Sequence, residues 1–257
     1  MLRGIYTSVS SMLTLQARQS VVTNNLANIN TTGYKEETLV GKSFEEVELY
    51  NKDKYINGKG TLQQLGSMSF GVRIDETATS FKQGNLVSTD NNTDFALEGD
   101  GFFKIIDENN NTFYTRDGSF KIDTQGYLVT NAGHYVAGIN SATGNEEPIY
   151  VGNEKVSLTP DNNIVINGVN LYKFKVVDFD NYDNLVKVGE NLYSGEGSYD
   201  ANGFNIKQGY LEGSNVDYIN STALLMETVN EFEANQKVIQ TIDSMLSKIA
   251  NEVGSVR

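Results

Sequence analysis

The sequence predicts an α+β chain with long N- and C-terminal helices paired as a coiled coil and a β-rich, sandwich- or barrel-like middle domain. Apolar residues recur at helical spacing at both ends of the 257-residue chain. Between the ends, turn-forming residues recur at intervals of about ten residues, as between short strands. We expect residues 1–35 and 214–257 to supply the terminal helices, with residues 36–213 as the middle domain.

The N-terminal helix is predicted from Leu2 to Ile29. Ile5, Val9 and Met12 repeat at intervals of four and three residues, as one face of a helix does. Polar residues interrupt the same face further along, so it is only half apolar. A turn ending at Gly33 should stop the helix, because glycine is the preferred residue just past a helix end.

The C-terminal helix is predicted from Val216 to Val253, with Asn215 as its N-cap. Apolar side chains recur there every seven residues, at Leu225, Phe232, Ile239, Leu246 and Val253, flanked by Val229, Ile242 and Ile249. A strict seven-residue apolar repeat favours supercoiling with another helix. A helix this long at a chain end needs a partner helix to bury its apolar stripe.

The middle of the chain predicts strands joined by turns. Phe102 to Ile106 is a short apolar run, Asp107 to Asn111 is a turn cluster, and Thr112 to Arg116 is a second strand. Similar alternation continues to about residue 179, which favours a sandwich or barrel over βαβ units. Residues 47–66 are polar and irregular, and we expect a long loop or projecting arm there.

Composition and charge restrict the function. The formal net charge is −13, which argues against non-specific nucleic-acid binding. Residues 1–35 carry +3 and residues 211–257 carry −4, so opposite charges could help the two ends meet. No apolar run reaches a membrane span, and no secretory h-region is visible at the N-terminus. By ordinary rules these features predict a cytosolic protein.

The sequence offers little chemistry. The chain has no cysteine, and His134 is its single histidine, so thiolate and multi-histidine metal sites are not expected. No nucleophile elbow or phosphate-binding loop is found, and no carboxylate pair is singled out for hydrolysis. The 14 Tyr and 12 Phe are explained by packing along strands, although aromatic rings also form carbohydrate platforms. We therefore predict no catalytic residue, cofactor, metal or small-molecule substrate.

Several motifs, in family order, resemble those of the flagellar basal-body rod and hook proteins. They are Asn24 to Lys35, Gln83 to Leu86, Asp94 to Phe103, Thr115 to Phe120, Gln208 to Asp217 and Glu233 to Thr241. The resemblance covers most of the chain, and the order of several motifs makes it specific.

The resemblance implies a structural subunit, not an enzyme, that self-assembles into the helical tube of the rod. Its implied partners are copies of itself, other rod subunits, the hook protein, the surrounding bushing or cell wall, and the flagellar export apparatus. Such subunits are exported without a cleaved signal peptide, so the implied location is the extracytoplasmic basal body, and the cytosolic prediction is revised. Open filaments of this kind require head-to-tail contacts that do not close.

Within that family, the length favours a rod protein over a hook protein, which usually carries an added outer domain. The stretch from Leu65 to Val72 loosely resembles the distal rod subunit, whose longer N-terminal loop stiffens the shaft. The Lys-rich segment Asn51 to Lys59 departs from that pattern, so a proximal rod subunit stays open as the alternative. A secreted β-rich glycan-binding module and a hydrolase are the rivals from other classes.

The candidate assembly residues come from both ends of the chain. They are Ile5, Val9, Met12, Asn25, Leu26, Asn28, Asn30, Gly33, Leu225, Val229, Phe232, Ile239 and Leu246. The asparagine amides could satisfy buried backbone groups between packed subunits, or simply cap the helix end. We expect the half-polar N-terminal helix to become ordered only when neighbouring subunits bury it.

Overall fold

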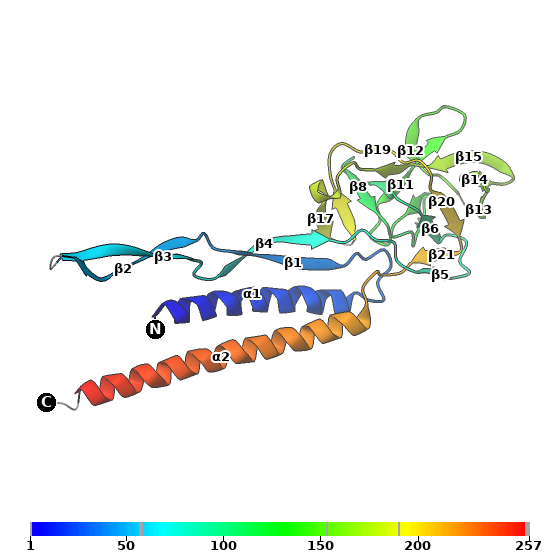
Figure 1. The fold of residues 1–257 in the computed structure, drawn as a ribbon. Coiled ribbons are helices and arrows are strands. Elements are labelled where there is room, and N and C mark those ends of the chain that lie inside the picture. The colour runs from blue at the N-terminus through cyan, green and yellow to red at the C-terminus, as the bar shows by residue number, and fades with distance from the viewer. Residues whose placement is uncertain (1, 57–58, 153, 190, 255–257) are drawn as a thin grey trace. The chain divides into compact units, whose positions relative to one another are not determined.

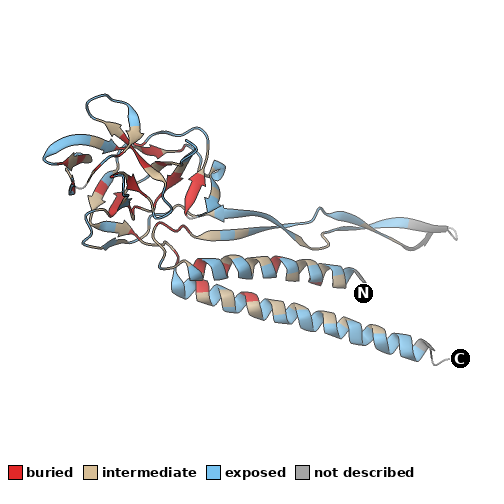
Figure 2. Ribbon diagram, turned by 180° about the vertical axis from the view of Figure 1, so that it is seen from behind, coloured by how far each residue is buried: buried red, intermediate tan, exposed pale blue. Residues whose placement is uncertain are grey.

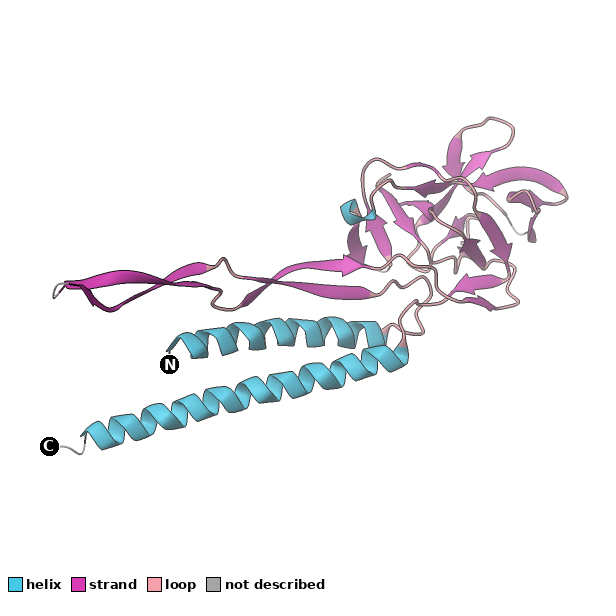
Figure 3. Ribbon diagram, viewed as in Figure 1, coloured by secondary structure: helices cyan, strands magenta, loops and turns pink. Residues whose placement is uncertain are grey.

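The chain is described by a computed structural model covering residues 2–56, 59–152, 154–189 and 191–254. It consists of an N-terminal helix, a strand-rich middle and a C-terminal helix, as the sequence predicts (Figure 3). It divides into two compact units, which are treated separately below. The helical unit holds residues 1–26, 37–78 and 218–257, and the strand unit holds residues 27–36 and 79–217.

The helical unit contains both terminal helices, α1 (Leu2–Ala27) and α2 (Tyr218–Gly254). They lie side by side and antiparallel (Figure 1). With 26 and 37 residues, they are about 39 Å and 56 Å long. The prediction that Asn215 caps the second helix is wrong. The helix begins at Tyr218, and the Asn215 side-chain amide instead donates to the carbonyls of Ser80 and Lys82.

Four strands complete the helical unit. They are β1 (Glu37–Ser43), β2 (Val47–Ile56), β3 (Lys59–Met68) and β4 (Val72–Thr79). β1 pairs with β4, and β2 pairs antiparallel with β3 in a register that sets Val47 opposite Met68. The segment expected as a loop or projecting arm at 47–66 is therefore a two-stranded hairpin, apart from residues 57–58, which lie outside the described residues. A two-stranded hairpin is marginal on its own in water, so it needs packing from elsewhere.

The strand unit is built of short antiparallel strands. They are β5 (Leu86–Ser88), β6 (Phe95–Glu98), β7 (Phe102–Ile106), β8 (Thr112–Thr115), β9 (Lys121–Ile122), β10 (Leu128–Val129), β11 (Tyr135–Asn140), β12 (Glu146–Pro148), β13 (Val156–Leu158), β14 (Asn163–Ile166), β15 (Val169–Phe174), β16 (Val176–Asp178), β17 (Val186–Gly189), β18 (Leu192–Ser194), β19 (Tyr199–Asp200), β20 (Asn205–Gln208) and β21 (Tyr210–Glu212), with a short 3₁₀ helix at Tyr182–Asn184.

The largest sheet of this unit runs in the order β13-β14-β15-β11-β7-β8-β18-β17. Its central pair is β11–β7, in which Val136 lies opposite Ile105, and β7 pairs on its other edge with β8, where Phe103 lies opposite Thr115. Short strands branch from this path: β9 pairs with β10, β10 and β12 with β11, and β16 with β7 and β19. Two small sheets, β6–β20 and β5–β21, bring the last strands before α2 back to the start of the unit.

Buried residues gather on the strands of the strand unit (Figure 2), and four of those in its main core are phenylalanines. Phe95, Phe103, Phe120 and Phe174 are each at most 2% exposed. Phe103 packs edge-to-face on Phe120 and on Phe174, with ring centroids 5.4 and 5.5 Å apart. Such pairs add to the stabilisation that burial of large apolar rings already gives.

A second cluster lies on the other face of β7. Phe102 and Tyr193 are fully buried there, and Phe81 and Tyr182 pack against them. Successive side chains of a strand point to opposite faces, so the adjacent residues Phe102 and Phe103 join different clusters. Strand β7 therefore connects two packed layers.

Replacing Phe103 by alanine should lower the free energy of unfolding of the strand unit by about 3–5 kcal/mol, because it empties the centre of the main core. Urea denaturation followed by tyrosine fluorescence measures this loss. Val186, which is 65% exposed, is the control, and its replacement by alanine should change the stability by no more than about 0.5 kcal/mol. Equal effects of the two substitutions would contradict this description of the core.

Candidate assembly surface and buried clasp

The inner face of α2 follows an alternating three- and four-residue spacing. The residues on it are buried or half-buried, and they are Ser221, Leu225, Thr228, Phe232, Asn235, Ile239, Ile242 and Leu246. The heptad residues Leu225, Phe232, Ile239 and Leu246 expected at the interface are among them and are half-buried, as is Val229. Ser221, Thr228 and Asn235 occupy the alternate positions, so this face is apolar at one position of each heptad and largely polar at the other.

Two polar contacts join α1 and α2. Asn235 donates its side-chain amide to the Ser11 hydroxyl at 3.2 Å. Arg18 and Glu231 form an ion pair at 3.9 Å, with both side chains more than a third exposed. Exposed pairs of this kind add little stability. The opposite charges of the two chain ends thus meet in one weak pair among the described residues.

A second face of α1 lies against the strands of the helical unit. The side-chain amide of Asn25 donates to the Glu37 carbonyl at 2.7 Å and accepts from the Glu37 backbone N–H at 3.1 Å. The Ser10 hydroxyl accepts from the backbone N–H of Val72. Asn25 thus satisfies backbone groups at the start of β1, which is the role in which an amide side chain is most useful. Leu26, next to it, is half-buried.

A third face of α1 is apolar and exposed. Tyr6, Val9 and Leu13 have 71%, 41% and 61% of their surface accessible. Their spacing of three and four residues places them on one stripe of the helix. Ile5 and Met12, expected on the interface together with Val9, are half-buried. On α2, Met226, Met245 and Ile249 are exposed as well. The helical unit therefore presents apolar helix surface that its own residues do not cover.

The buried clasp is a group of three charged side chains in the strand unit: Lys35, Arg116 and Glu212. Their side chains are at most 2% exposed. The Lys35 ammonium donates to Glu212 Oε1 at 2.7 Å, and the Arg116 guanidinium donates to Glu212 Oε2 at 3.4 Å. Lys35 comes from the segment after α1, Arg116 from the end of β8, and Glu212 from the last strand before α2. The carboxylate thus joins three parts of the chain that are distant in sequence.

Backbone groups add three further hydrogen bonds to the clasp. Lys35 also donates to the Lys82 carbonyl at 2.7 Å, Arg116 to the Gly99 carbonyl at 2.9 Å, and the Gly84 N–H to Glu212 Oε1 at 2.9 Å. Burial lowers the pKa of the Lys35 ammonium, and the neighbouring Glu212 carboxylate opposes that shift. Removing one member of a buried ion group leaves the others uncompensated, which is strongly destabilising.

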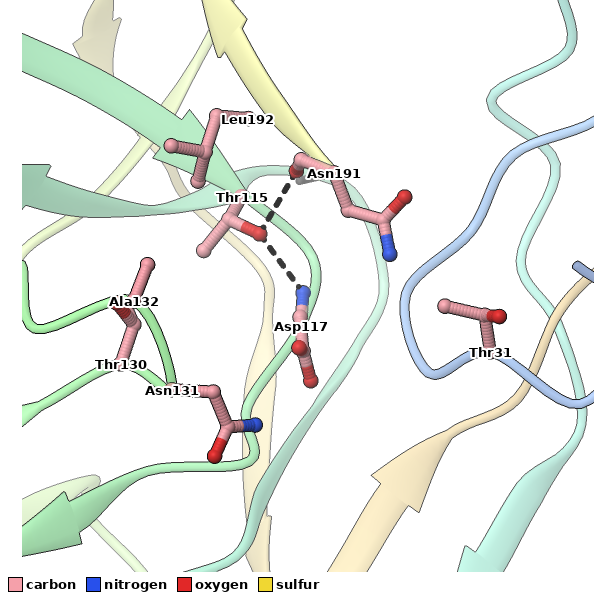
Figure 4. Close-up of a pocket in the computed structure, with 8 residues that line it drawn as sticks. All are labelled: Thr31, Thr115, Asp117, Thr130, Asn131, Ala132, Asn191 and Leu192. Atoms are coloured by element: carbon pink, nitrogen blue, oxygen red, sulfur yellow. Dashed lines mark hydrogen bonds between the residues drawn. The ribbon is translucent and has the colours of Figure 1, made fainter. Parts of the chain in front are cut away.

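The turn at residues 31–33 lines a pocket, in which Thr31 lies opposite Asp117 and Asn191 (Figure 4). The Thr32 hydroxyl donates to Asp117 Oδ1 at 2.8 Å, and the Asn191 side-chain amide donates to the Thr32 carbonyl at 2.9 Å. Thr115 organises the receiving surface, because its hydroxyl donates to the Asn191 carbonyl and accepts from the Asp117 N–H. Asn28 accepts from the Thr31 hydroxyl at 3.1 Å, while Asn30 is exposed.

Two glycines allow these segments to approach closely. Gly33 has a φ of +67°, and a Cβ there would lie 2.4 Å from the Asp117 nitrogen. A Cβ at Gly84 would lie 2.0 Å from the Gly213 carbonyl oxygen. Asn215 closes the same junction by accepting from the Glu36 N–H at 2.7 Å. The motif segments that are far apart in the sequence therefore meet within the strand unit.

Sequence reasoning missed the clasp. The sequence feature that could have indicated the clasp is a charged residue in each of three motifs, next to glycine or aromatic residues. Two examples are Gly33-Tyr34-Lys35 and Leu211-Glu212-Gly213. A charge in such an apolar, turn-rich setting is a candidate for a buried pair. Nothing in one sequence, however, indicates which cation meets which carboxylate.

Comparisons with known proteins agree with the family resemblance of these motifs. Three family descriptions match in order: "Flagella basal body rod protein" at residues 5–35, "Flagellar hook protein FlgE/F/G D1 domain" at 96–170, and "Flagellar basal body rod FlgEFG protein C-terminal" at 207–252. The chain is 34% identical to the flagellar basal-body rod protein FlgG of Borreliella burgdorferi, over 98% of this chain and 99% of the relative.

The chain belongs to the flagellar basal-body rod protein family.

Two further relatives show the breadth of this rod family. The chain is 31% identical to the flagellar hook-basal body complex protein FlhO of Bacillus subtilis, over the full length of both. It is 38% identical to the flagellar hook protein FlgE of Helicobacter pylori, but over 63% of this chain and only 22% of that longer protein. The rod-family chain is thus a structural component of the flagellar basal body. Within the described residues, no helix is both long and apolar enough to cross a bilayer.

Replacing Glu212 by glutamine should destabilise the strand unit by about 3–5 kcal/mol, because two buried cations lose their shared carboxylate. The matched control is Glu98→Gln, since Glu98 pairs with Lys207 at the surface with both side chains more than a third exposed. That change should cost far less, because exposed ion pairs add little stability. Urea unfolding of both variants measures the difference, and a Glu212→Gln variant as stable as the control would contradict the clasp.

Replacing Gly33 by alanine should destabilise the chain by more than the left-handed backbone alone costs, which is about 1–2 kcal/mol. The added methyl group would overlap the backbone of Asp117. Gly144→Ala is the control, because Gly144 has a similar φ of +70° with open space around its Cβ. Thermal unfolding of the two variants separates the clash from the strain, and equal losses would show that close docking of the turn is unimportant.

Proposed function

We propose that the chain is a subunit of the distal rod, self-assembling through its terminal helices into a helical tube that transmits torque from the motor to the hook. The observation that carries the proposal is the apolar helix surface left exposed in the single chain. Tyr6 and Leu13 on α1, and Met226 and Met245 on α2, are each more than half exposed. Apolar surface of this kind is stabilised when copies of the chain cover it.

The α2 heptads support a coiled-coil arrangement in the assembled rod. Leu225, Phe232 and Ile239 recur at seven-residue intervals and are only half-buried by the chain itself. A seven-residue repeat over several turns favours packing against further helices. In this proposal Ile5, Val9, Met12 and the heptad residues lie between subunits, and residues 1–35 and 214–257 form the inner assembly domain. Of residues 36–213, those of the strand unit then form the outer domain, as a closed or two-layered β structure, while residues 37–78 belong to the helical unit.

The length of the match favours a rod subunit over a hook subunit. The Borreliella rod relative is covered almost completely, whereas the Helicobacter hook relative is covered over about a fifth of its length. A proximal rod position is the alternative, and the full-length match to a hook-basal body complex protein leaves room for it. In either position the chain works by assembly and not as an enzyme. Its partners are other rod subunits, the hook, the surrounding bushing and the flagellar export apparatus.

Replacing both Tyr6 and Leu13 by serine should abolish rod assembly and swimming while leaving the strand unit folded. Both side chains are exposed in the single chain, so their loss should change monomer stability by no more than about 1 kcal/mol. Sedimentation of polymers and spreading of complemented cells in soft agar measure the effect. Val186→Ser is the control, because Val186 is equally exposed but lies in β17. Normal rods and swimming in the double variant would overturn the assignment of this helix face.

A further inference from the structure

A tyrosine-lined cleft of about 440 Å³ lies in the strand unit, away from the clasp. Four tyrosines line it together with one amide and one carboxylate: Tyr127, Tyr135, Tyr150, Tyr172, Gln125 and Glu147. Tyr135, Glu147 and Tyr172 lie on β11, β12 and β15, neighbouring strands that can be followed in Figure 1. Assembly through the terminal helices does not use these residues.

Three of the rings pack on one another. Tyr127 packs edge-to-face on Tyr135 and on Tyr150, with ring centroids 5.5 and 5.2 Å apart. None of these three tyrosines belongs to either apolar core of the described chain, and Tyr150 is 49% exposed. Stabilisation of the core therefore does not account for them.

The cleft is held rigid by the backbone. The Gly126 carbonyl accepts from the N–H groups of Val151 and Gly152, at 2.8 and 2.9 Å. A Cβ added at Gly126 would lie 3.0 Å from the Tyr150 ring, so that ring lies close over the turn. Rings that are fixed before binding lose little conformational entropy when a ligand stacks on them.

The polar groups of the cleft select the kind of ligand. Glu147 Oε1 accepts from the Asn140 amide at 2.6 Å, and the Tyr172 hydroxyl also donates to this carboxylate. A carboxylate has about four lone-pair sites, so it can still accept from a ligand. Gln125 is exposed at the rim and can both donate and accept. No lysine or arginine is found among the described residues that line the cleft, so nothing there would pair with a phosphate.

From this cleft we infer a binding site for a neutral oligosaccharide, whose apolar ring faces stack on the tyrosines while its hydroxyl groups donate to Glu147 and pair with Gln125. A proline-rich peptide could also use an aromatic groove. Its prolines, however, carry no N–H for the carboxylate to accept, whereas a sugar offers several donors. Open clefts with a few aromatic rings and a few polar groups are typical binding sites for small ligands.

The contact should be weak and short-lived. At a Kd of about 1 mM and an ordinary association rate of about 10⁶ M⁻¹s⁻¹, each bound sugar stays for about a millisecond. Such contacts can form repeatedly on a surface without holding it in place.

The full chain, at a concentration where it stays monomeric, should be titrated with cellotetraose and with tetra-N-acetylchitotetraose by calorimetry and NMR. We expect saturable binding of at least one of them with a Kd of about 1 mM, visible at about 10 mM ligand. Binding of both sugars would indicate that the cleft recognises the hydroxyl groups they share. Binding of the chitin fragment alone would indicate that the cleft also recognises its acetamido groups. Tyr150→Ala should weaken binding about tenfold, because it removes the exposed stacking ring. Tyr150→Phe should keep most of it.

Tyr199→Ala is the control, because Tyr199 is 43% exposed and does not line the cleft. It should bind like the unaltered chain, and circular dichroism should show the same fold for all variants. The proposal would be overturned if neither sugar bound at about 10 mM. It would also be overturned if Tyr150→Ala bound as tightly as the unaltered chain, or if a polyproline peptide bound and the sugars did not. None of these outcomes bears on rod assembly, which is measured separately.

Discussion

The buried carboxylate of Glu212 is the constraint on which the strand unit depends. It accepts from Lys35, Arg116 and the Gly84 backbone, so three charged side chains and one backbone group share a site closed to water. An ion taken out of water costs several kcal/mol, and that cost is offset only when its partners are all in place. The segment that follows α1 and the strand that precedes α2 are therefore folded together or not at all.

This constraint gives a physical reason for the family motifs. Gly33 and Gly84 lie where backbones approach too closely for a side chain, and Asn215 and Asp117 bond the turns that meet there. These are residues for which few substitutes would fit. The sequence of the helices is less restricted, because several apolar residue types can form an exposed apolar stripe. The two kinds of motif thus serve two purposes, a fixed junction and an adaptable assembly surface.

The tyrosine cleft is a feature of the strand unit that core packing does not explain. Three of its four rings lie outside both cores, Tyr172 packs against the main core, and the turn at Gly126 lies close to the Tyr150 ring. The clasp and the cleft belong to different parts of the same unit. The clasp joins distant segments of the strand unit at one site, and the tyrosines line a cleft at another.

The sequence by itself determined the helical ends, the strand-rich middle and the membership of the family. Those features depend on local periodicity, turn residues and short ordered motifs, which are readable along the chain. The predicted strand Phe102–Ile106 and the end of the first helix before Gly33 agree with the structure because both depend on nearby residues. The hairpin at 47–68 was not predicted as strands, because its polar pattern carries little of the alternation that a half-buried strand shows.

Only the tertiary structure decided which distant groups meet. It showed that Asn215 bonds Glu36, Ser80 and Lys82 instead of capping α2, and that Lys35 and Arg116 share Glu212. It also gathered four tyrosines, separated by up to 45 positions from Tyr127 to Tyr172, into one cleft. The reason is that a charge, an amide or a ring has the same local signature whether it is solvated or buried. Its role is set by partners that the fold brings from elsewhere in the chain.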